Sequence, residues 1–314
     1  MPLKLTVDSL KAEAAGLQQL LDEASQVGDI VGELQYKERL EEIASELAEL
    51  ADSDTHLASV AMFFSGKPVV GSRGISADFA GKLLESYQDI VSKAFAKAEV
   101  GVLGERGRIP LKQSADLMVT GLTHGSFGFV LEELADQTEP YDADLKEILS
   151  SVSDLLQHLG AENENDFDSA VEDLDPRSLG ALREFFKGLD TAGAQVRFVE
   201  DAREFSLDKK AVHRGRVRTE AIEIDERTEI INGVLMGFLP DHKKFELRDD
   251  AGTTIYGTVS KEAAEQFVRA VQHHAAVIGE PCEAEFIVRE VRPLNRPPRL
   301  NYRLVGFHKI GSAA

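Results

Sequence analysis

Five arginines and a single acid lie within fifteen residues, in the stretch REVRPLNRPPRLNYR at 289 to 303. The whole chain has 314 residues and a formal net charge of -20, so this concentration of positive charge runs against its composition. A planar guanidinium donates two parallel hydrogen bonds to a phosphate or a carboxylate. The prolines of the stretch stiffen its backbone, which lowers the entropy lost on binding. The sequence therefore predicts an anion-binding loop whose contacts are Arg292, Arg296, Arg299 and Arg303.

Further basic and aromatic residues accompany this loop. The basic ones are Lys243 and Lys244 in the stretch LPDHKKF, and Arg214, Arg216 and Arg218 in the stretch KKAVHRGRVR. The aromatic side chains of Tyr302, Tyr256 and Phe245 lie on predicted strands nearby, and such rings stack on the bases of single strands. The RxxxR spacing from residue 214 resembles the start of a PilZ domain, but the DxSxxG half of that pattern is missing downstream.

Charge divides the chain into two unequal parts. Residues 195 to 314 carry 19 basic and 19 acidic side chains, whereas residues 1 to 194 carry 16 basic against 36 acidic ones. An acidic surface repels nucleic acid, so a polyanion is expected to contact only the C-terminal third. Two kinds of partner fit the basic segment: a single-stranded nucleic acid, or an acidic protein surface. That surface can belong to the same chain, to a second copy or to another protein.

The C-terminal third predicts five strands and one helix. Apolar runs and alternation mark strands at 228–239, 244–248, 253–259, 282–291 and 299–307, and helical spacing marks 261–279. The order β-β-β-α-β-β resembles the OB-fold, a five-stranded barrel with its helix after the third strand. That resemblance implies that two connections, between strands one and two and between strands four and five, frame a ligand face. The two lysines and the arginine-rich loop occupy those connections.

The rest of the chain predicts two more parts. Apolar residues at spacings of three and four in 8–24 and 31–51 predict an antiparallel helical hairpin around the turn SQVGD. Apolar runs around a helix at 78–97 predict a ββαββ module, with its last two strands a hairpin joined at THG. A helix follows at 142–159, and another begins at Pro176 after a predicted N-cap at Asp175, with at most a short helix in ENENDFDSAVEDLD. The expected α+β fold has three domains: a hairpin at 1–55, an acidic module at 56–194 and an OB-like barrel at 195–314.

An alternative interpretation places an enzyme site among the glycine-rich loops of the central module. The stretches GSRG, GERG and THGS carry Arg73, Arg106, His124 and Ser126, which would surround an anionic substrate if the loops converged. Neither GK[ST] nor GxGxxG occurs in these loops, and Ser126 lacks the glycine and the following helix of a nucleophile elbow. The sequence therefore predicts no catalytic residue, leaves enzymatic activity open and favours a protein that binds without catalysis.

Composition favours a cytoplasmic binding or scaffolding protein that needs no cofactor. Cys282 is the only cysteine, which excludes an internal disulfide and a cysteine-based metal cluster, and no metal site is predicted. No run of about 18 apolar residues predicts a membrane span. A two-helix hairpin with a narrow apolar seam usually needs a partner surface, which can be the rest of the chain or a second copy of the protein. We expect self-association through the hairpin and a homo-oligomer.

Overall fold

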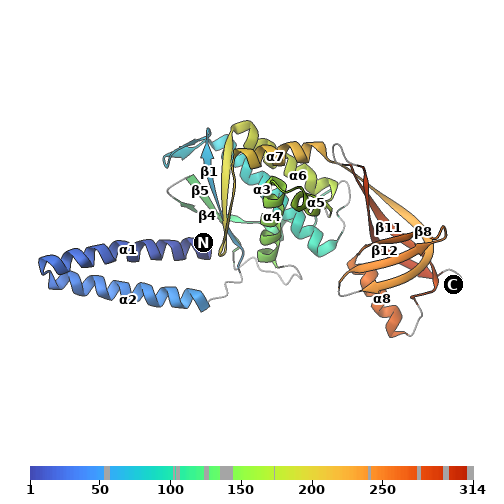
Figure 1. Ribbon diagram of the computed structural model, residues 1–314, viewed down its shortest axis with the longest axis horizontal. Helices are drawn as coiled ribbons and strands as arrows, with labels where there is room; N and C mark the ends of the chain where they lie inside the picture. The colour runs from blue at the N-terminus through green and yellow to red at the C-terminus, as the bar shows by residue number, and fades with distance from the viewer. Residues whose placement is uncertain are drawn as a thin grey trace.

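The computed structural model describes residues 1–52, 57–101, 103, 107–123, 127–134, 144–172, 174–239, 242–273, 277–292 and 297–309. Three parts follow one another along its longest axis: a helical hairpin, a central sheet with helices, and a β-barrel (Figure 1). The mixed α+β class and a closed C-terminal barrel, both predicted from the sequence, are confirmed.

The N-terminal hairpin consists of α1 (Leu3–Val27) and α2 (Ile30–Asp52). Gly28 ends α1 with φ 75°, a left-handed conformation that glycine adopts without strain, and the chain turns back at once. Leu10 and Ile43 are buried within the predicted seam. The base of the hairpin is attached to the central sheet, since the Lys4 amide donates to the Asp201 carbonyl at 2.8 Å.

The central sheet has the strand order β4-β5-β1-β6-β7, and every neighbouring pair is antiparallel. Its strands are β1 (Ser59–Gly66), β4 (Met118–Thr123), β5 (Phe127–Glu132), β6 (Ala194–Glu200) and β7 (Arg203–Leu207). Successive side chains of β1 point to opposite faces. Met62 and Phe64 join the large core under the helices, whereas Ala61 and Phe63 lie in a smaller cluster that Leu5 of α1 covers.

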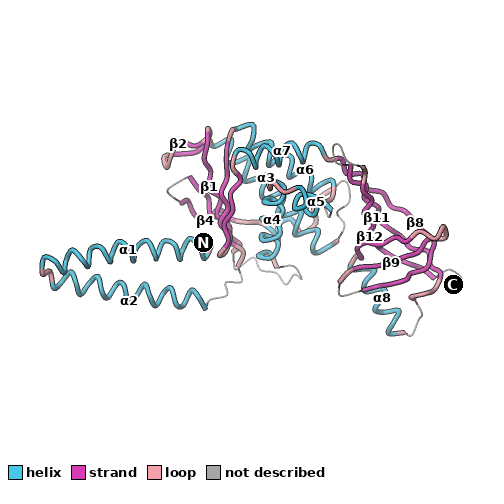
Figure 2. The backbone as a smooth tube through the Cα atoms, viewed as in Figure 1, coloured by secondary structure: helices cyan, strands magenta, loops and turns pink. Residues whose placement is uncertain are grey.

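Helices cover one face of this sheet (Figure 2). They are α3 (Ala77–Val100), α4 (Leu145–Gly160), α5 (Glu164–Glu172), α6 (Pro176–Ala192) and α7 (Lys209–Ala221), with a 3₁₀ turn, η1, at Lys112–Ala115. The predicted N-cap of α6 is confirmed, because the Asp175 carboxylate accepts hydrogen bonds from the amides of Arg177 and Ser178. The buried rings of Tyr87, Phe185 and Phe198 meet in the middle of this core.

The C-terminal part is a closed barrel with the strand order β10-β12-β11-β8-β9. Its elements are β8 (Glu223–Leu239), β9 (Lys244–Asp249), β10 (Thr254–Val259), α8 (Lys261–Gln272), β11 (Pro281–Arg292) and β12 (Arg299–Lys309). The β10–β12 pair is parallel and the other pairs are antiparallel. Phe238 stacks on Phe267 of α8 with ring centroids 4.1 Å apart, so the helix joins the barrel core.

Strands β8 and β11 reach beyond the barrel to the central part, and the start of β12 pairs along the other edge of β11. Residues 223 to 229 of β8 pair with residues 286 to 292 of β11. At this end Val291 is buried in the core of the central sheet together with Ile222, and Ile224 packs against the same core. The barrel is therefore joined to the central part by an arm of these strands, which has its own apolar anchor.

Two details differ from the sequence-based division. Strands β6 and β7 and helix α7 pack with the central sheet, although the division assigned all residues from 195 onward to the barrel domain. The reason is that β6 pairs with β1, about 130 residues earlier, and local alternation does not identify a strand's partner. The stretch VVGSRGI forms a separate small ribbon, β2 (Val69–Val70) with β3 (Gly74–Ile75), and not a strand of the main sheet.

Candidate functional site

A groove on the barrel gathers basic side chains from distant parts of the chain. It has a volume of about 610 Å³ and is lined by residues of β9 to β12 and one residue of α3. Its basic lining residues are Lys97, Lys244, Arg289, Arg299 and Arg303. None of the described residues that line the groove is acidic, although the chain as a whole carries a charge of -20. The groove is therefore a locally positive surface on a negatively charged protein.

Strand alternation presents the side chain of Lys244 outward. In β9, Phe245 and Leu247 are buried in the barrel, so Lys244, Glu246 and Arg248 point to solvent. In β10, Ile255 and Val259 are buried in the same way. The outer face of the two strands is therefore polar, and Glu246 is the acid on it.

Strand register brings two cations into one row across the barrel. Thr258 of β10 lies opposite Lys244 of β9 on one side and Arg303 of β12 on the other. Adjacent strands are roughly 4.8 Å apart, so the row brings the two basic residues close together with a hydroxyl between them. Gly257 permits this arrangement, because a Cβ at its position would lie 2.0 Å from the carbonyl oxygen of Tyr302.

The other wall of the groove comes from helix α3. Lys97 lies in the last turn of this helix, and Gly101 caps its C-terminus. The Arg303 guanidinium reaches the same helix end, with Nη2 3.4 Å from the position of a Cβ on Gly101. Helix C-termini attract cations, which favours this placement of Arg303. Lys97 was not predicted as a groove residue, because nothing in its local sequence spacing links α3 to a barrel more than 120 residues later.

The three aromatic candidates differ in exposure. Tyr256 has 75 % of its surface exposed, on the groove side of β10. Phe245 is 3 % exposed and belongs to the barrel core. Tyr302 is partly buried and contacts Phe286 edge to face, with ring centroids 6.1 Å apart. Of the three, Tyr256 presents the ring most accessible to a ligand.

Two arginines of the opening stretch are held by carboxylates of the arm. Arg289 is buried and donates to Glu226 Oε2 from Nη2 at 3.0 Å and from Nε at 3.2 Å. Arg292 contacts Glu290 Oε1 at 2.9 Å and also Asp225. The Arg292 guanidinium lowers the pKa of Glu290 through a hydrogen bond, and the exposed Arg227 contributes to the same shift. These two arginines therefore hold the arm together beside the groove.

The arginines of α7 lie outside the groove and contact acids and carbonyls of the central part. Arg214 contacts Glu162 at 3.4 Å and the Gly160 carbonyl at 3.1 Å. Arg216 contacts Asp190 at 3.1 Å and Glu220 at 3.0 Å. Arg218 contacts Glu164 at 2.5 Å, the carbonyls of Leu159 and Ala161, and the face of the Phe167 ring. These contacts are charge pairs within one molecule. An acidic surface of the same chain is one of the possible partners that the sequence left open.

Several predicted contacts fall elsewhere. Arg296 of the arginine-rich loop, and Arg106, His124 and Ser126 of the glycine-rich loops, lie outside the described residues. Arg73 is exposed in the turn between β2 and β3. Lys243 is exposed in the turn just before β9, with φ 49°. The proposed convergence of the glycine-rich loops around a substrate therefore stays a prediction.

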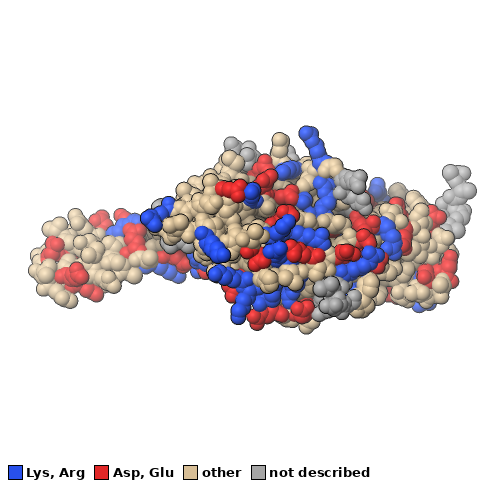
Figure 3. Space-filling view, turned by 90° about the horizontal axis from the view of Figure 1, so that it is seen from above, with Lys and Arg blue, Asp and Glu red and all other residues tan. Residues whose placement is uncertain are grey.

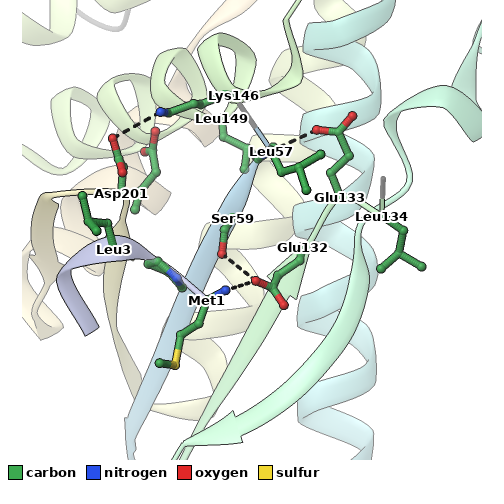
Figure 4. Close-up of a pocket in the computed structure, with 13 residues that line it drawn as sticks. Met1, Leu3, Leu57, Ser59, Glu132, Glu133, Leu134, Lys146, Leu149 and Asp201 are labelled. Atoms are coloured by element: carbon green, nitrogen blue, oxygen red, sulfur yellow. Dashed lines mark hydrogen bonds and ion pairs between the residues drawn. The ribbon is translucent and has the colours of Figure 1, made fainter. Parts of the chain in front are cut away.

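A second hollow of about 370 Å³ lies where the chain start meets the central sheet (Figure 4). Its polar groups contact one another: the Met1 amine and the Ser59 hydroxyl contact Glu132, and the Ala58 amide donates to Glu133 at 3.1 Å. Lys146 lies 3.5 Å from Asp201. These contacts tie β1, β5, β6 and α4 together, so the hollow is accounted for by packing of the central part.

Glu200 also lines this hollow and is the most unusual acid of the central part. It is only 5 % exposed, and its Oε2 has no hydrogen-bond partner among the described residues. Burial raises the pKa of Glu200, although Ser153 and Arg203 oppose the shift. Removal of the carboxylate from water disfavours its charged form, which is why the pKa rises.

The described part of the chain contains neither a cluster of metal ligands nor a helix that could span a membrane. No group of three histidine, cysteine or acidic side chains is placed to hold a metal ion among those residues. No described helix is both long and apolar enough to span a bilayer. Cys282 is buried, and burial raises the pKa of its thiol, which disfavours the reactive thiolate.

Comparisons with known proteins add no family. No protein-family model matches the chain, and neither the curated proteins nor the solved structures include a match. The groove itself therefore carries the functional argument.

Proposed function

We propose that the protein binds single-stranded nucleic acid in the barrel groove, with the phosphates on its basic side chains and one base on Tyr256. The observation that carries the proposal is the composition of the groove: five of its described lining residues are basic and none is acidic, although the chain as a whole is acidic. Single-strand binders combine such a positive groove with exposed aromatic rings, because phosphates need cations and every base has a face that stacks.

The strand arrangement supports an OB-like assignment. Counting from β8, the first strand pairs with the second and fourth, and the third and fifth are parallel neighbours, with α8 between strands three and four. OB-folds bind oligonucleotides on the face of strands two and three, between the loops that join strands one to two and four to five. Lys244 and Tyr256 lie on that face, and Arg299 begins the fifth strand.

An acidic protein surface is the competing partner, and two features favour nucleic acid over it. Tyr256 offers a flat, largely exposed ring, which a base can stack on over its full area. The groove also contains neutral side chains that can hydrogen-bond to sugars and bases, namely Thr254, Thr258 and Asn301.

Fluorescence anisotropy with labelled oligo-thymidylate, the matching duplex and an oligo-uridylate tests the proposal. We expect single strands to bind more tightly than the duplex, with affinity falling steeply as salt increases. Each phosphate contact contributes about 0.7 to the log-log salt slope of a single strand, so Lys244→Ala and Arg299→Ala should each reduce the slope by about that amount. Arg248→Ala is the matched control, because Arg248 is exposed on the same strand as Lys244 but does not line the groove.

Absence of binding to every oligonucleotide at low salt would overturn the proposal. Polyglutamate provides the contrasting probe. If it binds and the nucleic acids do not, the groove recognises acidic polypeptide instead.

A further inference from the structure

The free end of the helical hairpin carries an exposed apolar cluster. Its members, Leu20, Val27, Ile30, Val31 and Leu34, are called the hairpin tip from here on, and Val27 and Ile30 are 81 % and 80 % exposed. Leu20 and Val27 are seven residues apart on α1, and Ile30 and Leu34 are four apart on α2, so each pair shares one helix face. Soluble proteins rarely expose such contiguous apolar patches without a partner for them.

The charge around the hairpin tip has one sign. Residues 12 to 36 contain five acids and no lysine or arginine. Figure 3 shows the outer end of the hairpin in red and tan, with blue only nearer the body of the molecule. The hairpin tip is thus an apolar surface inside a negative field, and it fits a surface that is apolar and positive.

The barrel groove has these two properties. Its lining includes the exposed Tyr256 and Leu300 beside Lys244 and Arg299, and no acid among the described lining residues. Hairpin and barrel lie at opposite ends of the molecule (Figure 1), and α1 with 25 residues extends roughly 37 Å away from the central sheet. A contact between hairpin tip and groove must therefore join two copies of the chain.

We propose that the hairpin tip of one copy docks in the barrel groove of a second copy, where it competes with nucleic acid. The inference rests on the proposed function in one respect, the anion preference of the groove. Such a contact is heterologous: each copy offers a tip to one neighbour and a groove to another, so association builds rings or chains. Contact between two tips is disfavoured, because it would bring two sets of five acids together.

Sedimentation velocity of the full chain measures this association. At low salt we expect the weight-average mass to rise with concentration from 34.4 kDa to at least twice that value. In about 1 M salt the Debye length falls to about 3 Å, and we expect the mass to return toward that of one chain. A mass of one chain at all concentrations and salts overturns the inference.

Two double variants identify the contact, because each removes one of its two sides, either the hairpin tip or the groove. The tip variant carries Ile30→Ser with Leu34→Ser, and the groove variant carries Lys244→Glu with Arg299→Glu. Neither should associate alone, but a mixture should form a dimer, since the groove variant retains its tip and the tip variant retains its groove. The control, Val268→Ser with Val271→Ser, removes exposed apolar side chains from α8 and should associate like wild type. Circular dichroism checks that all three remain folded.

The mixing experiment separates the possible contacts. A groove variant that still associates alone indicates a tip-to-tip contact and contradicts the inference, as does a mixture that stays monomeric. The proposed function is judged separately by oligonucleotide anisotropy. Nucleic-acid binding without self-association overturns the inference alone, whereas self-association without nucleic-acid binding overturns the proposed function alone. If both hold, adding oligo-thymidylate should dissociate the assembly.

Discussion

Arg289 and Glu226 form a buried ion pair between the arm strands β11 and β8, directly opposite each other in the strand register. Their side chains are only 9 % and 11 % exposed, and both Nε and Nη2 of the guanidinium donate to a single carboxylate oxygen. The pair lies next to Val291 and Ile224, which anchor the arm in the central core. It therefore links the groove lining to the junction between barrel and central part.

Removing the acid of this pair should destabilise the protein strongly. Glu226→Ala leaves the Arg289 guanidinium buried without its counter-charge, which lowers the free energy of unfolding by about 3–5 kcal/mol. Glu229→Ala is the control, because Glu229 contacts the exposed Arg227 and ion pairs at the surface contribute little to stability. Urea unfolding followed by circular dichroism measures both, and equal effects would contradict the importance of burial.

Tyr256 should contribute to ligand affinity without contributing to stability. Stacking of one base on an aromatic ring contributes about 1–3 kcal/mol, so Tyr256→Ala should weaken oligo-thymidylate binding about 5- to 150-fold. Tyr256→Phe retains the ring and should bind nearly as well as wild type. Because the side chain is largely exposed, we expect both variants to unfold within about 0.5 kcal/mol of wild type. Unchanged anisotropy titrations for the alanine variant would remove Tyr256 from the site.

Two helical glycines should respond to alanine with opposite signs. A Cβ on Gly215 of α7 would lie 2.3 Å from a ring carbon of Phe186, whereas a Cβ on Gly180 of α6 meets nothing within 4 Å. Gly215→Ala should therefore lower the free energy of unfolding by about 1–3 kcal/mol through overpacking. Gly180→Ala should raise it by up to about 1 kcal/mol through helix propensity. Urea unfolding of the pair tests the packing of α7 on α6, and a stabilised Gly215→Ala variant would contradict it.

Glu200 should make stability depend on pH in the direction opposite to most acids. Burial raises its pKa in the folded state above the ordinary value of 4.5. As pH rises from that value, the unfolded state ionises first, so the wild type loses stability until the folded state has ionised too. Glu200→Gln removes the charge and should be the more stable protein near pH 7, with the difference disappearing below about pH 4.5.

The comparison needs urea midpoints at several pH values between 4 and 7. Glu283→Gln serves as the control, since Glu283 is exposed on β11 and its replacement should not change the midpoint in this pH-dependent way. A wild type more stable than Glu200→Gln near pH 7 would mean that attraction to Arg203 outweighs the desolvation of the carboxylate.

The sequence by itself determined the local elements of this protein. Helical spacing predicted the hairpin of α1 and α2, and alternation with turn residues predicted the strands that close the barrel. Both predictions were possible because each periodicity depends only on residues that are neighbours in the sequence. The Asp175–Pro176 cap was predictable for the same reason. Basic residues concentrated in 289–303 also marked the barrel as the place to search for an anion site.

Only the tertiary structure decided which of these residues act together. It placed β6 beside β1, paired Arg214, Arg216 and Arg218 with distant acids, and brought Lys97 of α3 to the barrel groove. It also separated the exposed Tyr256 from the buried Phe245, which lie on adjacent strands. Strand partners, charge partners and exposure depend on segments that meet only after folding, and residue spacing along the chain does not encode them.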